Sequence, residues 1–188
     1  MNLLDLARKR KSVRKYLDRP VEAEKIEALS EVARRAREAY NACDAALVIA
    51  DDPILKEKLK SAIVSGWQGK INLWLYTSAF PAAMVLLGRS GGSAEEIRPL
   101  FLPPACMMLE TVILAAAEMG LGTCWMAGFN PAAVRKVLQL PPEWQPIIVS
   151  PLGYSAQKEV VGLISRTMVQ ADRRKPIAEI HEMRGKLA

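Results

Sequence analysis

Residues 119–129 read MGLGTCWMAGF, and this stretch decides how the sequence is interpreted. It follows a long, nearly uniformly apolar segment, residues 105–119, which Pro103 and Pro104 open. A helix with so small a polar face is typical of a central position or of a subunit interface. The two glycines near its end, Gly120 and Gly122, predict a helix stop and a tight turn. The stretch therefore predicts a buried helix that runs directly into a glycine-rich turn.

Elements on either side of this stretch predict a layered α+β protein with a central sheet flanked by helices. Short apolar runs bounded by polar or turn residues indicate strands, whereas apolar residues spaced three or four apart indicate helices. No internal repeat or linker is visible, so we expect a single domain over residues 1–188. The predicted strands are 46–50, 82–87 and 147–152; the predicted helices are 22–39, a segment containing Leu55, Leu59 and Ile63, and 131–138; residues 66–80 are ambiguous.

Composition limits the class of protein. Of the 188 residues, 51% are hydrophobic and 24% are charged, which excludes a wholly disordered or collagen-like chain. The apolar runs are much shorter than the roughly 20 residues of a membrane helix, and no secretion signal is visible. We therefore expect a cytoplasmic protein without a membrane partner.

Cysteine and histidine are scarce. Cys43, Cys106 and Cys124 form no C-x-x-C pair, and His181 is the only histidine. This set does not favour a zinc site, a disulfide framework or a histidine-dependent nucleophile. We therefore predict no metal site and name no catalytic acid, base or nucleophile.

Positive charge is concentrated at the two ends of the chain. The net charge is +6; residues 1–20 carry seven Lys or Arg against two Asp, and residues 158–188 carry seven basic against four acidic residues. A nucleic-acid surface, an anionic small ligand and simple solubility would each explain this pattern. Nucleic acid is the least favoured of the three, because few aromatic residues accompany the cations.

The basic run RKSVRKY at residues 10–16 has the pattern of an anion clamp. In an extended chain, Arg10, Ser12 and Arg14 point to one side, and Val13 points to the other, toward a core. Two guanidinium groups that flank a hydroxyl suit phosphate, since arginine can donate two parallel hydrogen bonds to it. This run predicts a phosphate-binding strip near the N-terminus.

Three segments together resemble the nitroreductase family of FMN-dependent oxidoreductases. They are the strip at 10–16, the stretch at 119–129, and PPEWQPIIVSPLGY at 141–154, with RRKP following at 173–176. Their order and spacing match the family across nearly the whole chain. The resemblance implies a mostly antiparallel sheet of four or five strands flanked by helices, assembled as an intertwined homodimer with FMN at the interface.

In proteins of this kind, NADH or NADPH reduces the flavin, which then passes electrons to a nitroaromatic, a quinone or a similar electron-poor molecule. The resemblance assigns the FMN phosphate to Arg10, Lys11, Ser12, Arg173 and Arg174. It places Arg14 near the pyrimidine ring, where its charge would stabilise the anionic reduced flavin. Further cofactor contacts are the side chain of Asn72 and the backbone N–H groups of Ala127 and Gly128.

One segment departs from the family. Many members carry a Pro-Ser-x-x-Asn-x-Gln-Pro-Trp stretch whose polar groups reach the flavin of the partner chain. The corresponding residues 37–45 here read REAYNACDA, so the resemblance leaves only Asn41 as a cofactor contact in this segment. This leaves two hypotheses: an FMN-dependent NAD(P)H oxidoreductase with an altered pocket, or a protein of the same fold with a non-catalytic ligand-binding or regulatory role. The colour of the purified protein distinguishes them.

Overall fold

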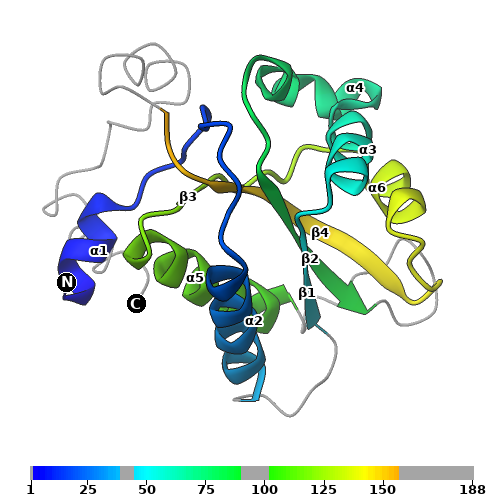
Figure 1. Ribbon diagram of the computed structural model, residues 1–188. Helices are drawn as coiled ribbons and strands as arrows, with labels where there is room; N and C mark the ends of the chain where they lie inside the picture. Colours follow the sequence, from blue (N-terminus) through cyan, green and yellow to red (C-terminus); the bar gives the residue numbers. More distant parts are fainter. Residues whose placement is uncertain (1, 39–44, 90–101, 157–188) are drawn as a thin grey trace, which may run out of the picture. The chain divides into compact units, whose positions relative to one another are not determined.

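A computed structural model describes residues 2–38, 45–89 and 102–156 (Figure 1). By its internal contacts the chain divides into two units, residues 1–156 and 157–188, and every described element belongs to the first. The prediction of one domain over residues 1–188 stays a prediction. The elements are α1 (Leu3–Lys9), α2 (Ala23–Glu38), β1 (Ala45–Ala50), α3 (Pro53–Val64), α4 (Gly66–Gly69), the 3-10 helix η1 (Lys70–Thr77), β2 (Ala82–Arg89), α5 (Leu102–Glu118), β3 (Gly122–Thr123), α6 (Pro131–Val137) and β4 (Trp144–Gly153).

The strands form one sheet in the order β1-β2-β4-β3, and each neighbouring pair is antiparallel. This confirms the predicted α+β class with a mostly antiparallel sheet. Strand β4 begins at Trp144, three residues before the predicted start at residue 147. Its pairing with β2 continues to Trp144 past an irregularity in the register. Leu86 pairs with Ile148 but Leu87 pairs with Pro146, so one residue of β4 is skipped beside a proline that cannot donate a hydrogen bond.

Strand β2 is buried on both faces, and its residues alternate between two cores. Met84 and Leu86 belong to a core that α2 and α5 complete. Val85 and Leu87 belong to a second core, to which α3, η1 and α6 contribute. Figure 1 shows these two groups of helices on opposite sides of the sheet. The sequence of β2 is therefore a continuous apolar run, as expected for a strand with no solvent-facing side.

The boundaries of α5 correct the prediction. The helix begins at Leu102, so Pro103 and Pro104 lie inside its first turn instead of preceding it. Proline is tolerated there, since the first N–H groups of a helix have no partner within the helix. Most of the ambiguous segment 66–80 is helical: α4 continues into η1, which ends at Thr77, and Asn72 interrupts it with non-helical backbone angles. None of the described helices is long and apolar enough to cross a membrane.

The glycine stretch and the basic strip are adjacent in space. The turn at 119–129 contains the short strand β3, which pairs with the end of β4. Residues 10–16 lie beside β3, where Ser12 forms a parallel bridge with Thr123 and the Val13 N–H donates to the Thr123 carbonyl at 2.8 Å. The strip thus extends the sheet beyond β3, at the edge opposite β1.

Candidate functional site

The contact between the basic strip and β3 is close because Gly122 has no side chain. Val13 is buried, as predicted, and a Cβ added to Gly122 would lie 2.7 Å from Val13 Cγ2 and 2.9 Å from Val13 Cβ. The strip is also anchored at its other end, where the Tyr16 N–H donates to Ser78 Oγ at 2.9 Å. Burial raises the pKa of the Tyr16 hydroxyl, which donates to the Val13 carbonyl at 2.7 Å. The backbone of the strip is therefore fixed on two sides.

The predicted phosphate-binding side chains remain accessible in this position. Arg10, Ser12 and Arg14 are each partly buried, and Lys11 is exposed. Arg10 Nε lies 3.9 Å from Glu110 Oε1 on α5. Burial raises the pKa of the Cys124 thiol, and the nearby charge of Arg14, a hydrogen bond from Ser12 and the charge of Arg10 lower it in smaller amounts. The strip that carries these three residues therefore runs beside Thr123, the neighbour of Cys124.

Asn72 contacts another predicted site residue directly. Its Nδ2 donates to the Gly128 carbonyl at 2.5 Å, and its side chain is buried. The non-helical angles at Asn72 turn this side chain inward, whereas Ile71 and Leu73 on either side are exposed. Asn72 thus joins η1 to the turn that contains Ala127 and Gly128.

A second side-chain contact joins the same two parts of the chain. Asn130 Oδ1 accepts from the Ala133 N–H at 3.0 Å and so caps α6, while its Nδ2 donates to Ser65 Oγ at 2.9 Å. Ser65 precedes α4. The segment 65–72 is therefore held against residues 128–130 by one amide group near each end.

The backbone around Ala127 has donors available for a ligand. Ala127 is exposed and Gly128 is partly exposed. Within residues 2–38, 45–89 and 102–156, no group accepts a hydrogen bond from the N–H of either residue. The preceding residue, Met126, is fixed by reciprocal hydrogen bonds with Val149 of β4, at 2.9 and 3.0 Å. The turn therefore presents two N–H groups from a rigid base.

Strand β4 sets the spacing between the cationic group and this turn. Thr123, the neighbour of Ser12, pairs with Leu152, and Met126 pairs with Val149. Three residues of extended strand span about 10 Å. The site thus offers cations and a hydroxyl at one end and backbone donors at the other, which suits an elongated ligand with an anionic tail and a polar ring.

Three predicted site residues, Asn41, Arg173 and Arg174, lie outside the described residues, as does most of the divergent segment 37–45. Among the residues that the structure does describe, no group of three His, Cys, Asp or Glu side chains could hold a metal ion.

Sequence reasoning missed two residues beside the site. Glu110 is acidic in an otherwise apolar stretch of α5, a signal that could have marked it as a partner for a cation. Ser150 is fully buried in β4, where its Oγ accepts from the Cys124 N–H at 3.1 Å and donates to the Pro151 carbonyl at 2.9 Å. Nothing in the sequence around Ser150 distinguishes it from an ordinary strand residue.

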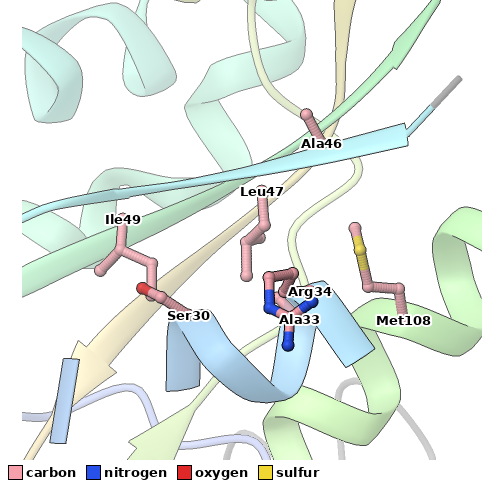
Figure 2. A pocket seen from close by; sticks show the side chains of 7 residues that line it. All are labelled: Ser30, Ala33, Arg34, Ala46, Leu47, Ile49 and Met108. Atoms are coloured by element: carbon pink, nitrogen blue, oxygen red, sulfur yellow. The ribbon is translucent and has the colours of Figure 1, made fainter. Parts of the chain in front are cut away.

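A separate hollow lies between α2, β1 and α5 (Figure 2). It is at the edge of the sheet formed by β1, whereas the basic strip extends the opposite edge. Arg34, the charged residue in its lining, is paired with Glu31 at 2.7 Å. The hollow is thus distinct from the candidate site; its lining residues are Ser30, Ala33, Arg34, Ala46, Leu47, Ile49 and Met108.

Comparison with known proteins agrees with this geometry. A curated relative from Methanothermobacter thermautotrophicus, assigned provisionally as an NADH dehydrogenase/NAD(P)H nitroreductase, is 26% identical over 162 residues, which cover 84% of this chain and 79% of the relative. A nitroreductase family protein of known structure from Clostridium difficile 630 is 27% identical, with a TM-score of 0.70 and 96% of each chain covered.

An FMN-dependent nitroreductase from Clostridium difficile R20291 shares the fold at 22% identity, with a TM-score of 0.68 over 84% of this chain and 90% of that one. The model of the nitroreductase family matches residues 7–154, which include the basic strip, the glycine stretch and β4. The chain belongs to the nitroreductase family.

Proposed function

We propose that the protein is an FMN-dependent oxidoreductase that accepts hydride from NADH or NADPH and delivers electrons to a nitroaromatic, a quinone or another electron-poor acceptor. The observation that carries this proposal is the bridge between Ser12 and Thr123, which sets the basic strip beside the strand leading to Ala127 and Gly128. The nitroreductase family model spans both segments, and one protein that shares the fold is described as FMN-dependent.

The donor set fits FMN. Arg10, Ser12 and Arg14 supply two cations and a hydroxyl from a fixed backbone, as a phosphate requires. The N–H groups of Ala127 and Gly128 are exposed or partly exposed, and glycine permits close approach of a flat ring. Both halves of the cofactor would therefore find partners of the right chemistry.

When bound, FMN supplies the two-electron chemistry, and the protein's own residues bind and orient it. Arg10, Lys11 and Ser12 would hold the phosphate, with Arg173 and Arg174 as further cations. Arg14 would place positive charge near the pyrimidine ring, where negative charge develops on reduction. Asn72 fixes the Gly128 carbonyl, and so orients the N–H groups of the turn, besides any contact of its own with the ring. Asn41 and a second subunit would complete the pocket in a homodimer.

A second candidate function is a non-catalytic ligand-binding or regulatory role, and one observation favours it. Glu110 lies 3.9 Å from the guanidinium of Arg10, so a carboxylate competes with a phosphate for that cation. Together with the divergent segment 37–45, this contact predicts a pocket that differs from those of typical family members.

The absorbance spectrum of the purified protein tests the proposal. We expect flavin bands that bleach when NADH or NADPH is added anaerobically. Arg10→Ala combined with Arg14→Ala should abolish flavin retention in a folded protein. The matched control is Arg34→Ala with Arg35→Ala, which removes two arginines paired with Glu31 on the surface of α2 and should retain flavin. A colourless wild-type protein that cannot be reconstituted with FMN would favour the second function instead.

A further inference from the structure

The chain segments that meet at β3 and β4 keep one register on both sides of a gap in their pairing. Before the gap, Thr123 pairs with Leu152, and after it Met126 pairs with Val149. The two pairs lie three positions apart in both segments, so neither segment contains an inserted residue. Strand β3 nevertheless ends at Thr123, and the pairing resumes only at Met126. The gap therefore has a local cause.

Pro151 supplies this cause. Met126 and Val149 exchange two backbone hydrogen bonds, at 2.9 and 3.0 Å. In an antiparallel ladder such reciprocal pairs recur at every second residue, so the next one toward β3 would join Cys124 to Pro151. Because proline has no N–H group, this pair cannot exchange both bonds.

The Ser150 hydroxyl stands between the two groups that would otherwise bond directly. Its Oγ accepts from the Cys124 N–H at 3.1 Å and donates to the Pro151 carbonyl at 2.9 Å. Two successive hydrogen bonds span more than one, so this bridge holds the Cys124 backbone farther from β4 than a direct bond would. Ser150 is 0% exposed and Cys124 is 3% exposed, so the hydroxyl, rather than bulk water, satisfies the Cys124 N–H.

Cys124 lies between the two halves of the candidate site. It directly follows Thr123, which forms the bridge with Ser12 of the basic strip. Three residues later the chain reaches Ala127, whose N–H belongs with that of Gly128 to the other half of the site. A shift of the Cys124 backbone toward β4 would therefore move the turn relative to the strip.

We infer that Ser150 is a positioning residue for the cofactor, and that its hydroxyl bridge sets the distance between the basic strip and the turn at Ala127 and Gly128. This inference rests on the proposed function, because that distance matters only if one FMN molecule spans both halves. Ser150 is fully buried and acts through Cys124. The affinity for FMN should therefore depend on the bridge beyond any effect of the bridge on stability.

Fluorescence titration with FMN, after any retained flavin has been removed, tests this inference. In Ser150→Ala the Cys124 N–H either loses its acceptor or closes directly onto the carbonyl of residue 151, and both changes displace the turn. We expect the Kd for FMN to rise about fivefold, the effect of one misplaced neutral hydrogen bond. Pro151→Ala alone keeps the hydroxyl and should leave the Kd unchanged.

The double variant, Ser150→Ala with Pro151→Ala, separates position from stability. Residue 151 gains an N–H group, so it can form with Cys124 the reciprocal pair that the register provides. We expect the melting temperature and the exchange protection of the Cys124 amide to recover, while the Kd for FMN stays raised because the two segments have closed together. Recovery of FMN affinity as well would overturn the inference, since the hydroxyl would then only satisfy a buried N–H.

Ile113→Val is the matched control for stability. It removes one methylene group from a fully buried side chain of α5, and should lower the melting temperature without changing the Kd for FMN. An equal rise in Kd for Ile113→Val, or a wild-type Kd for Ser150→Ala, would overturn the inference and leave the proposed function intact. A wild-type protein that takes up no FMN would overturn the proposed function, and the inference with it.

Discussion

The two sides of the candidate site are built by different kinds of contact. On the side of the basic strip, the contacts with the sheet are mainly between backbone groups: Val13 donates to the Thr123 carbonyl, and Leu17 donates to the Tyr154 carbonyl. On the side of α4 and η1, the segment is held to the turn by the side-chain amides of Asn72 and Asn130. Under the proposed function, the first side would hold the phosphate of the cofactor, and the second supports the turn that contains Ala127 and Gly128.

This difference indicates that amino-acid substitutions disturb the basic strip less than they disturb α4 and η1. Backbone hydrogen bonds survive most substitutions, so the strip depends on side chains at few points: where Val13 packs on Gly122, and where Tyr16 contacts Ser78 and the Val13 carbonyl. Side-chain contacts disappear when one residue is replaced, and the position of α4 and η1 therefore depends on Asn72 and Asn130.

The largest expected effect is that of Gly122→Ala, which disturbs the contact between β3 and the basic strip. The new methyl group would lie 2.7 Å from Val13 Cγ2, closer than van der Waals contact allows, and would push the strip away from β3. We expect unfolding in urea to lose about 2–3 kcal/mol, a typical cost of overpacking. Flavin retention should fall together with stability.

Val13→Ala in the same chain provides the control for this effect. It removes the two methyl groups nearest to the added Cβ, so the double variant should recover part of the stability that Gly122→Ala loses, measured as a double-mutant cycle. Simple additivity of the two losses would show that the strip and β3 are not coupled through this contact.

A smaller effect is expected from Asn72→Leu, which removes one of the two side-chain contacts between the segment 65–72 and residues 128–130. Leucine has a similar shape but cannot donate to the Gly128 carbonyl, so we expect a loss of about 1 kcal/mol in unfolding free energy. Hydrogen exchange should accelerate across residues 66–77, whereas the amides of Val13 and Leu17 should keep their protection. Equal acceleration in both regions would contradict the division between the two sides.

Ser65→Ala is the matched variant for the second amide contact. It removes the acceptor for Asn130 Nδ2 but leaves the cap that Asn130 provides to α6. We expect the same regional pattern of exchange as for Asn72→Leu, near the start of α4 rather than within η1.

Much of the fold could be predicted from the sequence, because β2 and α5 are apolar over most of their length and differ clearly in length, 8 against 17 residues. The extended strip with Val13 turned to the core was also predictable, since alternation specifies it. The pairing of Ser12 with Thr123 was not: β3 has two residues, too few for a periodic signal. Nor could the residues flanking Asn72 reveal that its side chain reaches Gly128, 56 residues away, because that contact depends on a local break in helical geometry.

The smallest expected effect concerns Glu22, whose side chain contacts Tyr154 near the end of the basic strip. Tyr154, whose carbonyl accepts from the Leu17 N–H, donates its hydroxyl to Glu22 at 2.6 Å. That hydrogen bond is the main reason why the pKa of Glu22 falls to about 2, with a hydrogen bond from Arg19 and the charge of Lys25 adding to it. Because the folded pKa is lowered, the stabilisation is complete above the ordinary pKa of about 4.5 and is lost as the pH falls toward 2.

Glu22→Gln should therefore lower the melting temperature slightly at pH 6, and the difference from wild type should shrink as the pH falls from 4.5 toward 2. Glu31→Gln is the comparison, because the pKa of Glu31 is also about 2 but its partners, Arg34 and Arg35, lie on its own helix. Both variants should show the same dependence on pH. Glu22, unlike Glu31, contacts Tyr154, the residue that follows β4, so its variant should also speed exchange of the Leu17 amide. An unchanged Leu17 amide would mean that backbone pairing and the contact of Lys25 with Tyr154 secure this end of the strip without Glu22.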